Sequence, residues 1–208
     1  LGIQNLIVVH SEEMDKGDHR DAKPVNDLDE VALIKGIKSL QDIEDALDAG
    51  AAKASMSSAA VREPELIEQA AREFGPEHIV VAIDADQSDE LPSGYEVYVD
   101  GGRTPTGIDA LQFAKAAEGR GAGTILPTSK RTDGTREGYD IKLTRGIADL
   151  VGVPVVASGG AGTMQHFLEA ATEGKADVLL AASVFHFGEI GIPELKAFLK
   201  KNGVAVCE

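Results

Sequence analysis

Residues 154–163 read Pro-Val-Val-Ala-Ser-Gly-Gly-Ala-Gly-Thr, and a helical pattern carrying Phe167, Leu168 and Ala171 follows. A short apolar run without alternation is typical of a strand buried on both faces of a parallel sheet. Glycines directly after such a strand allow a tight turn and a close approach of the backbone to an anion. We therefore expect a strand-turn-helix unit here. Its turn either binds phosphate or uses its glycines for geometry alone, and we favour the phosphate site.

The same succession of apolar run and helical pattern recurs along the chain. The expected strands are residues 5–10, 31–35, 52–57, 79–84, 124–129, 154–158 and 177–183. Between them, Ser39 and Asp42 form a capping box at a helix start. Pro64 begins a second helix, and Thr106 with Asp109 caps a third. Repeated strand-helix units predict an α/β fold with a parallel sheet and helical crossovers.

The glycines and small polar residues gather just after the strands, which favours a (β/α)8 TIM-barrel-like fold over a doubly wound sheet. Seven units are visible, so the first unit of the barrel is expected to be missing or rearranged. We expect a single domain over residues 1–208. Residues 11–30 are strongly polar and are predicted to be weakly structured. Residues 86–104 are predicted to form an inserted loop or hairpin, because 95–99 alternate in polarity.

The composition of the 208 residues limits the partners. The chain has 35 acidic and 20 basic residues, a formal charge of −15, which disfavours nucleic acid. No run of about 18 apolar residues exists, so a membrane partner is not expected. The single cysteine, Cys207, fits a reducing compartment, so we expect a cytoplasmic protein. The five histidines lack metal-ligand spacing, and neither a metal nor a cofactor is expected.

The candidate site follows from the loops at the carboxyl ends of the strands. Asp84 ends a buried strand and is a candidate general acid or base, with a structural cap as the alternative. Asp133 faces the same rim and is the second catalytic candidate. The candidate phosphate- and substrate-binding residues are Gly36, Ser57, Ser58, Thr128, Gly134, Thr135, Ser158, Gly159, Gly160, Ala182 and Ser183. For Gly36 with Ser57-Ser58, the spacing alone fits two ordinary strand-helix turns equally well. Lys53 begins its strand and is expected at the opposite face.

From about residue 39 onward the chain resembles the cyclase subunit of imidazole glycerol phosphate synthase, a (β/α)8 barrel of histidine biosynthesis. The matching runs are Ser57-Ser58-Ala59-Ala60-Val61, Val80-Val81-Ala82-Ile83-Asp84, Gly101-Gly102-Arg103, Arg120-Gly121-Ala122-Gly123, Asp133-Gly134-Thr135, Gly138-Tyr139-Asp140, residues 157–162 with 166–170, and residues 181–187. The resemblance implies a lyase that takes ammonia from a glutaminase partner. Ammonia would attack a bisphosphorylated ribulosyl substrate and give imidazole glycerol phosphate and an aminoimidazole carboxamide ribotide.

The resemblance also assigns roles to single residues. Asp84 would be one of two catalytic aspartates. One phosphate would lie on Gly134, Gly160 and Ser183, with Asp133 and Thr135 nearby, and the other on Gly36 and Ser58. Lys53 would belong to the charged gate where ammonia enters.

The departures from the family pattern leave three hypotheses open. The aspartate of the family's first strand has no counterpart, residues 2–6 align with the start of its second strand, and His10 stands where that strand ends in aspartate. The chain is then a cyclase, a catalytically impaired barrel that only binds phosphorylated ligands, or an interaction protein. In the last case an open strand edge would favour a homodimer.

Overall fold

A computed structural model describes the backbone of residues 2–3, 5–8 and 33–206, and the side chains of residues 36–206. The predictions for residues 11–30, His10 and Cys207 lie outside the described residues. In the described part of the chain, no helix has the length and apolar character needed to cross a membrane.

The described elements alternate between strands and helices. The strands are β1 (Gly2–Ile3), β2 (Asn5–Val8), β3 (Leu33–Lys35), β4 (Lys53–Met56), β5 (Ile79–Gln87), β6 (Tyr95–Val99), β7 (Thr104–Asp109), β8 (Thr124–Ser129), β9 (Val156–Ala157), β10 (Val178–Ala181) and β11 (Ala205–Val206). The helices are α1 (Leu40–Asp48), α2 (Ser58–Arg62), α3 (Glu65–Phe74), α4 (Ala110–Gly119), α5 (Ile141–Ala148), α6 (Met164–Thr172), α7 (Ser183–His186) and α8 (Ile192–Lys201).

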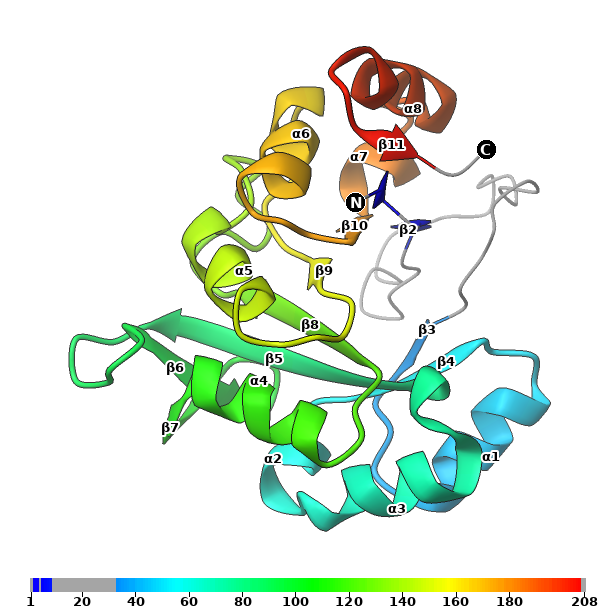
Figure 1. Ribbon diagram of the computed structural model, residues 1–208, viewed down its shortest axis with the longest axis vertical. Helices are drawn as coiled ribbons and strands as arrows, with labels where there is room; N and C mark the ends of the chain where they lie inside the picture. Colours follow the sequence, from blue (N-terminus) through cyan, green and yellow to red (C-terminus); the bar gives the residue numbers. More distant parts are fainter. Residues whose placement is uncertain (1, 4, 9–32, 207–208) are drawn as a thin grey trace.

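Seven strands of the described residues form a parallel arc in the order β3-β4-β5-β8-β9-β10-β2 (Figure 1). Two bridges, Ile125 with Val155 and Thr128 with Ser158, join β8 to β9. Helices α4, α5, α6 and α8 flank the outside of this arc (Figure 1). The predicted α/β fold with a parallel sheet is therefore confirmed. The closed eight-stranded barrel is not, because no pairing among the described residues joins β2 to β3.

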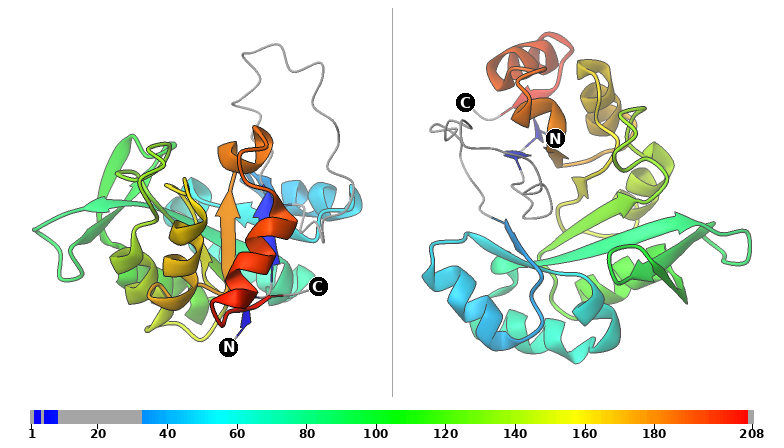
Figure 2. Two further views of the ribbon diagram at one scale, coloured as in Figure 1. Left: turned by 90° about the horizontal axis from the view of Figure 1, so that it is seen from above. Right: turned by 180° about the vertical axis from the view of Figure 1, so that it is seen from behind.

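Strand β2 lies beside β10 and runs parallel to it (Figure 2). In a closed eight-stranded barrel, the neighbour of the last strand is the first strand. The pairing of Asn5 with Val178 thus puts β2 at the place that a first strand occupies in such a barrel, and the predicted absence of a first unit is not confirmed. The apolar run itself could not reveal this, because its partner is set by contacts across the whole chain.

The sheet separates an inner core from two outer cores. Five side chains of the central strands gather on the inner side, with Ala82 packed against them: Val80, Leu126, Val156, Val178 and Leu180. Their neighbours in sequence, such as Val81 and Leu179, point outward into clusters beneath the helices. This alternation, with both faces apolar, is why the strands read as continuous apolar runs.

Strand β5 is longer than predicted. It does not end at Asp84 but continues to Gln87, because the hairpin of β6 and β7 replaces β4 as its neighbour. Asp84 pairs with Tyr98 of β6 on one side and with Thr128 of β8 on the other. The hairpin extends away from the arc on the side of β5 (Figure 1). Asp84 consequently lies within a sheet instead of at the start of a loop.

Helix α4 shows a second difference from the prediction. Thr106 lies in β7, where its hydroxyl donates to the Val97 carbonyl at 2.7 Å, so it does not cap the helix. Asp109 alone is the N-cap, and one carboxylate oxygen accepts from the N–H groups of Leu111 and Gln112 at 3.0 Å. Its other oxygen accepts from the Ser93 N–H at 2.8 Å, which ties the hairpin to the helix.

We expect Asp109→Ala to lower the free energy of unfolding by about 1–2 kcal/mol at pH 7, the usual loss for a helix cap. Burial raises the pKa of Asp109, but the N–H donors of Gln112, Ser93 and Leu111 outweigh it and hold the pKa below its usual value. A lowered folded-state pKa contributes stability above the unfolded value of about 3.9 that is lost as pH falls. Urea unfolding at pH 7 and pH 3 should show the difference between the two proteins shrinking. An unchanged difference at pH 3 would contradict this explanation.

Candidate functional site

Three predicted site residues form one row across neighbouring strands. Asp84 is the register partner of Thr128, and Thr128 is the bridge partner of Ser158. Asp84 lies two positions after Ala82, Thr128 two after Leu126, and Ser158 two after Val156. Leu126 and Val156 belong to the inner core, and Ala82 packs against it. Side chains two apart in a strand share a face. The row therefore lies on the inner side of the arc, at the carboxyl ends of the strands.

The loops after β8 and β9 contact each other directly. The Gly138 N–H donates to the Gly160 carbonyl at 2.8 Å, and the Thr132 hydroxyl donates to the Gly159 carbonyl at 3.2 Å. A β-carbon built on Gly159 would lie 3.3 Å from Asp133. The structure thus brings the predicted residues Asp133, Gly159 and Gly160 together.

The remaining residues of this half belong to adjoining segments. Gly134 and Thr135 follow Asp133 in the loop after β8, where the Thr135 hydroxyl donates to the Thr132 carbonyl at 2.8 Å. Ala182 and Ser183 come directly after β10, Ala182 as the N-cap of α7 and Ser183 as its first residue. Because β9 lies between β8 and β10, these segments share the same end of the sheet.

Tyr139 connects the loop after β8 to β10. Its hydroxyl donates to the Leu180 carbonyl at 2.9 Å, and its ring packs edge-on against Phe167 with centroids 5.7 Å apart. Complete burial raises its pKa well above the ordinary value, so it remains a neutral donor. Sequence reasoning assigned no role to Tyr139, because its partner is a backbone atom two strands away.

The other half of the candidate site follows β3 and β4. Gly36, with a φ of +94°, is exposed directly after β3. Ser57 is the N-cap of α2, and its side chain makes no capping hydrogen bond. The Ser58 hydroxyl accepts from the N–H of Asp100, in the turn between β6 and β7, at 2.9 Å. This turn therefore reaches the predicted Ser57-Ser58 segment.

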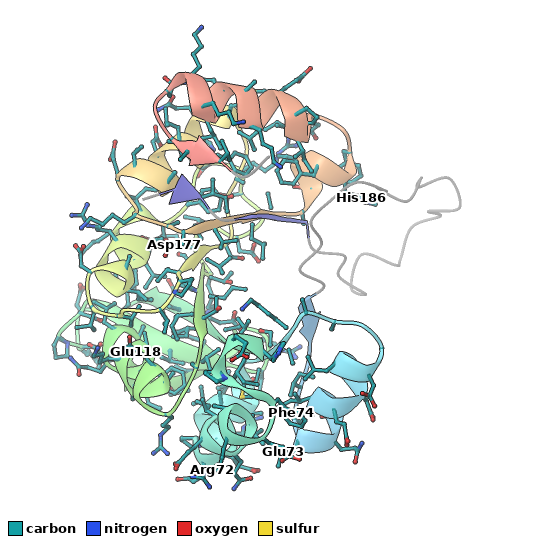
Figure 3. The ribbon with its side chains drawn as sticks, turned by 45° about the vertical axis from the view of Figure 1, so that its right-hand side comes forward. Arg72, Glu73, Phe74, Glu118, Asp177 and His186 are labelled. Carbon is teal, nitrogen blue, oxygen red and sulfur yellow. The ribbon has the colours of Figure 1, made fainter. Side chains whose placement is uncertain are left out.

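Lys53 lies at the opposite end of the strands, as its position predicts. Its ammonium donates to the Glu77 carbonyl and lies 3.4 Å from the Thr124 hydroxyl, at the amino ends of β5 and β8. Burial lowers the pKa of Lys53, and the Glu77 carboxylate opposes part of this effect. Figure 3 shows the two ends of the sheet through Asp177, before β10, and His186, beyond it. Lys53 is therefore separated from the row of Asp84 by the length of a strand.

The chemical groups of the candidate site lie at the carboxyl ends of the strands. The carboxyl end combines a half-buried carboxylate, hydroxyls and glycine-rich loops, which suits a phosphorylated ligand and proton transfer. Within the described residues, no group of three His, Cys, Asp or Glu side chains is placed to hold a metal ion.

The chain is similar to known proteins of histidine biosynthesis. A model of the family described as histidine biosynthesis protein matches residues 24–191. The chain belongs to this family. Among relatives, the chain is 54% identical over 157 residues to "Imidazole glycerol phosphate synthase subunit HisF" of Prochlorococcus marinus (strain MIT 9211). The match covers 76% of this chain and 61% of the relative, so the chain spans about three fifths of that protein's length.

Proposed function

We propose that this chain of the histidine biosynthesis family carries the cyclase activity of imidazole glycerol phosphate synthase. The observation that supports it most strongly is the placement of Asp84. This carboxylate lies on β5, between β4 with its Ser57-Ser58 segment and β8 with its Asp133-Gly134-Thr135 segment. A substrate with a phosphate at each end would place its middle over Asp84.

In the proposed reaction, each half of the site binds one phosphate. Gly36 and Ser58 hold one phosphate, and Gly134, Gly160 and Ser183 hold the other, with Ser57, Thr128, Thr135, Ser158, Gly159 and Ala182 lining the same rim. Ammonia adds to the ketone carbon of the ring-opened ribulosyl chain, and the ketone oxygen leaves as water. Closure of the imidazole ring then breaks the carbon–nitrogen bond to the aminoimidazole carboxamide ribotide and releases it. Asp84 accepts or returns a proton in these steps, and Asp133 is the second candidate for such a role. Proton transfer by a positioned carboxylate accelerates such steps by about 100-fold or more.

The amino end of the strands is the proposed entrance for ammonia. Lys53, half-buried between Glu77 and Thr124, would line this entrance, and a glutaminase subunit would dock there to supply ammonia. The name of the relative, a synthase subunit, supports such a partner. A cytoplasmic location is proposed with this role.

The decisive measurement is turnover of the bisphosphorylated ribulosyl substrate with free ammonia, followed by the appearance of both products. The matched control omits ammonia. Product formation that requires ammonia supports the cyclase. Substrate that raises the melting temperature without turnover would support the binding-only hypothesis. No turnover and no shift would overturn both ligand-based proposals and leave the interaction hypothesis, for which size-exclusion chromatography would reveal a homodimer.

A further inference from the structure

Lys130 occupies a position that the proposed mechanism does not use. It is the first residue after β8, and its N–H donates to the Ala85 carbonyl at 2.9 Å. Its ammonium lies 3.6 Å from the Asp86 carboxylate of β5 and 3.5 Å from the centre of the Tyr98 ring of β6. Lys130 therefore contacts β5 and the first strand of the hairpin, β6.

The stem of Lys130 also packs against the hairpin turn. A β-carbon built on Gly102 would lie 3.2 Å from Cγ and Cδ of Lys130, so the backbone of the turn rests on this side chain. Gly102 has a φ of +76° and is buried. The absence of a side chain at Gly102 allows this close approach.

The other side of the same turn is attached to the segment after β4. The Asp100 N–H donates to the Ser58 hydroxyl, and the Asp100 carboxylate lies 2.6 Å from the Arg62 guanidinium of α2. Asp100 has a φ of +57°, a strained conformation for a residue other than glycine. The turn is thus held from β4 on one side and from Lys130 on the other.

We propose that Lys130 is a positioning residue that, through the hairpin turn 100–103, fixes the spacing between the two phosphate-binding halves. This inference rests on the proposed function, since it requires a phosphate at each half. A ligand that spans two sites gains affinity only when their separation matches its length. Loosening the turn would therefore weaken a bisphosphorylated ligand while leaving each single phosphate bound as before.

The test compares the substrate with its two products, each of which carries one phosphate. Dissociation constants are measured by titration calorimetry for the parent, Lys130→Met and Tyr98→Leu. Methionine keeps most of the stem on Gly102 but removes the charge, whereas leucine removes the ring without changing charge. Both variants should weaken binding of the substrate by about 10-fold, because the two phosphates would no longer bind as one linked ligand. They should weaken binding of each product by less than about 3-fold. Lys130→Arg should recover the substrate affinity, because arginine also stacks on tyrosine.

The control is Lys115→Met, which removes an exposed ion pair with Glu118 on α4 and should change no affinity. If Lys130 bound phosphate directly, Lys130→Met would weaken binding of one product as much as binding of the substrate, and Tyr98→Leu would have no such effect. This result would overturn the positioning role. Unchanged substrate affinity in both variants would overturn it as well. A parent that binds substrate no more tightly than either product would instead refute the two-phosphate site itself.

Discussion

Asp84→Asn is expected to lower the turnover number of the cyclase reaction by about 100-fold or more, the usual contribution of a positioned general acid or base. Asparagine has nearly the same shape as aspartate but cannot take up or release a proton near neutral pH. Asp84 lies in the row with Thr128 and Ser158 on the inner side of the sheet. The substitution should therefore leave substrate affinity close to that of the parent.

The measurement is the turnover number and the Michaelis constant with free ammonia, so that a glutaminase partner is not required. Asp45→Asn is the matched control, because Asp45 is an exposed residue of α1 that accepts a hydrogen bond from Gln41 of the same helix. The control should keep parental kinetics. Parental turnover in Asp84→Asn would remove Asp84 from the mechanism. A large rise in the Michaelis constant with unchanged turnover would make it a binding residue instead.

Local sequence patterns sufficed for much of the fold. The apolar runs of β5, β8 and β10 are strands near their predicted positions, and Ser39 with Asp42 forms the predicted capping box. These features depend on residues within a few positions of one another. The glycine turn after β9 could be predicted for the same reason, because its residues directly follow those of the strand.

The features that sequence did not predict depend on distant contacts. The apolar run of residues 79–84 predicts Asp84 at a strand end, yet β6 pairs with β5 beyond it. The partner of β2 and the contact of Tyr139 with Leu180 likewise join residues far apart in the chain. The position of Lys130 could be predicted in part from the sequence, because it continues the alternation of Leu126 and Thr128 and should point to the inner face. Its contact with Tyr98 could not be predicted, because that contact depends on the pairing of β5 with β6.

Gly160→Ala is expected to destabilise the protein by about 4 kcal/mol or more, in the range of the most damaging single substitutions. A β-carbon on Gly160 would lie 2.0 Å from the Gly138 carbonyl oxygen, so the backbone of one loop must move. The movement would disrupt the hydrogen bond from the Gly138 N–H to the Gly160 carbonyl. Gly160 also has a φ of +102°, which side-chain-bearing residues rarely adopt.

Two further variants separate the contact from the backbone conformation. Gly101→Ala places alanine at a φ of +65° with no atom within 4 Å, and should cost about 1 kcal/mol. A β-carbon on Gly162 would lie 2.1 Å from the Arg136 carbonyl oxygen without a positive φ, so Gly162→Ala should approach the effect at Gly160. Free energies of unfolding from urea titration provide the comparison. If Gly160→Ala cost no more than Gly101→Ala, the loops after β8 and β9 would not be in close contact. The proposed phosphate site would then lose the packing that brings Gly134 and Gly160 to one place.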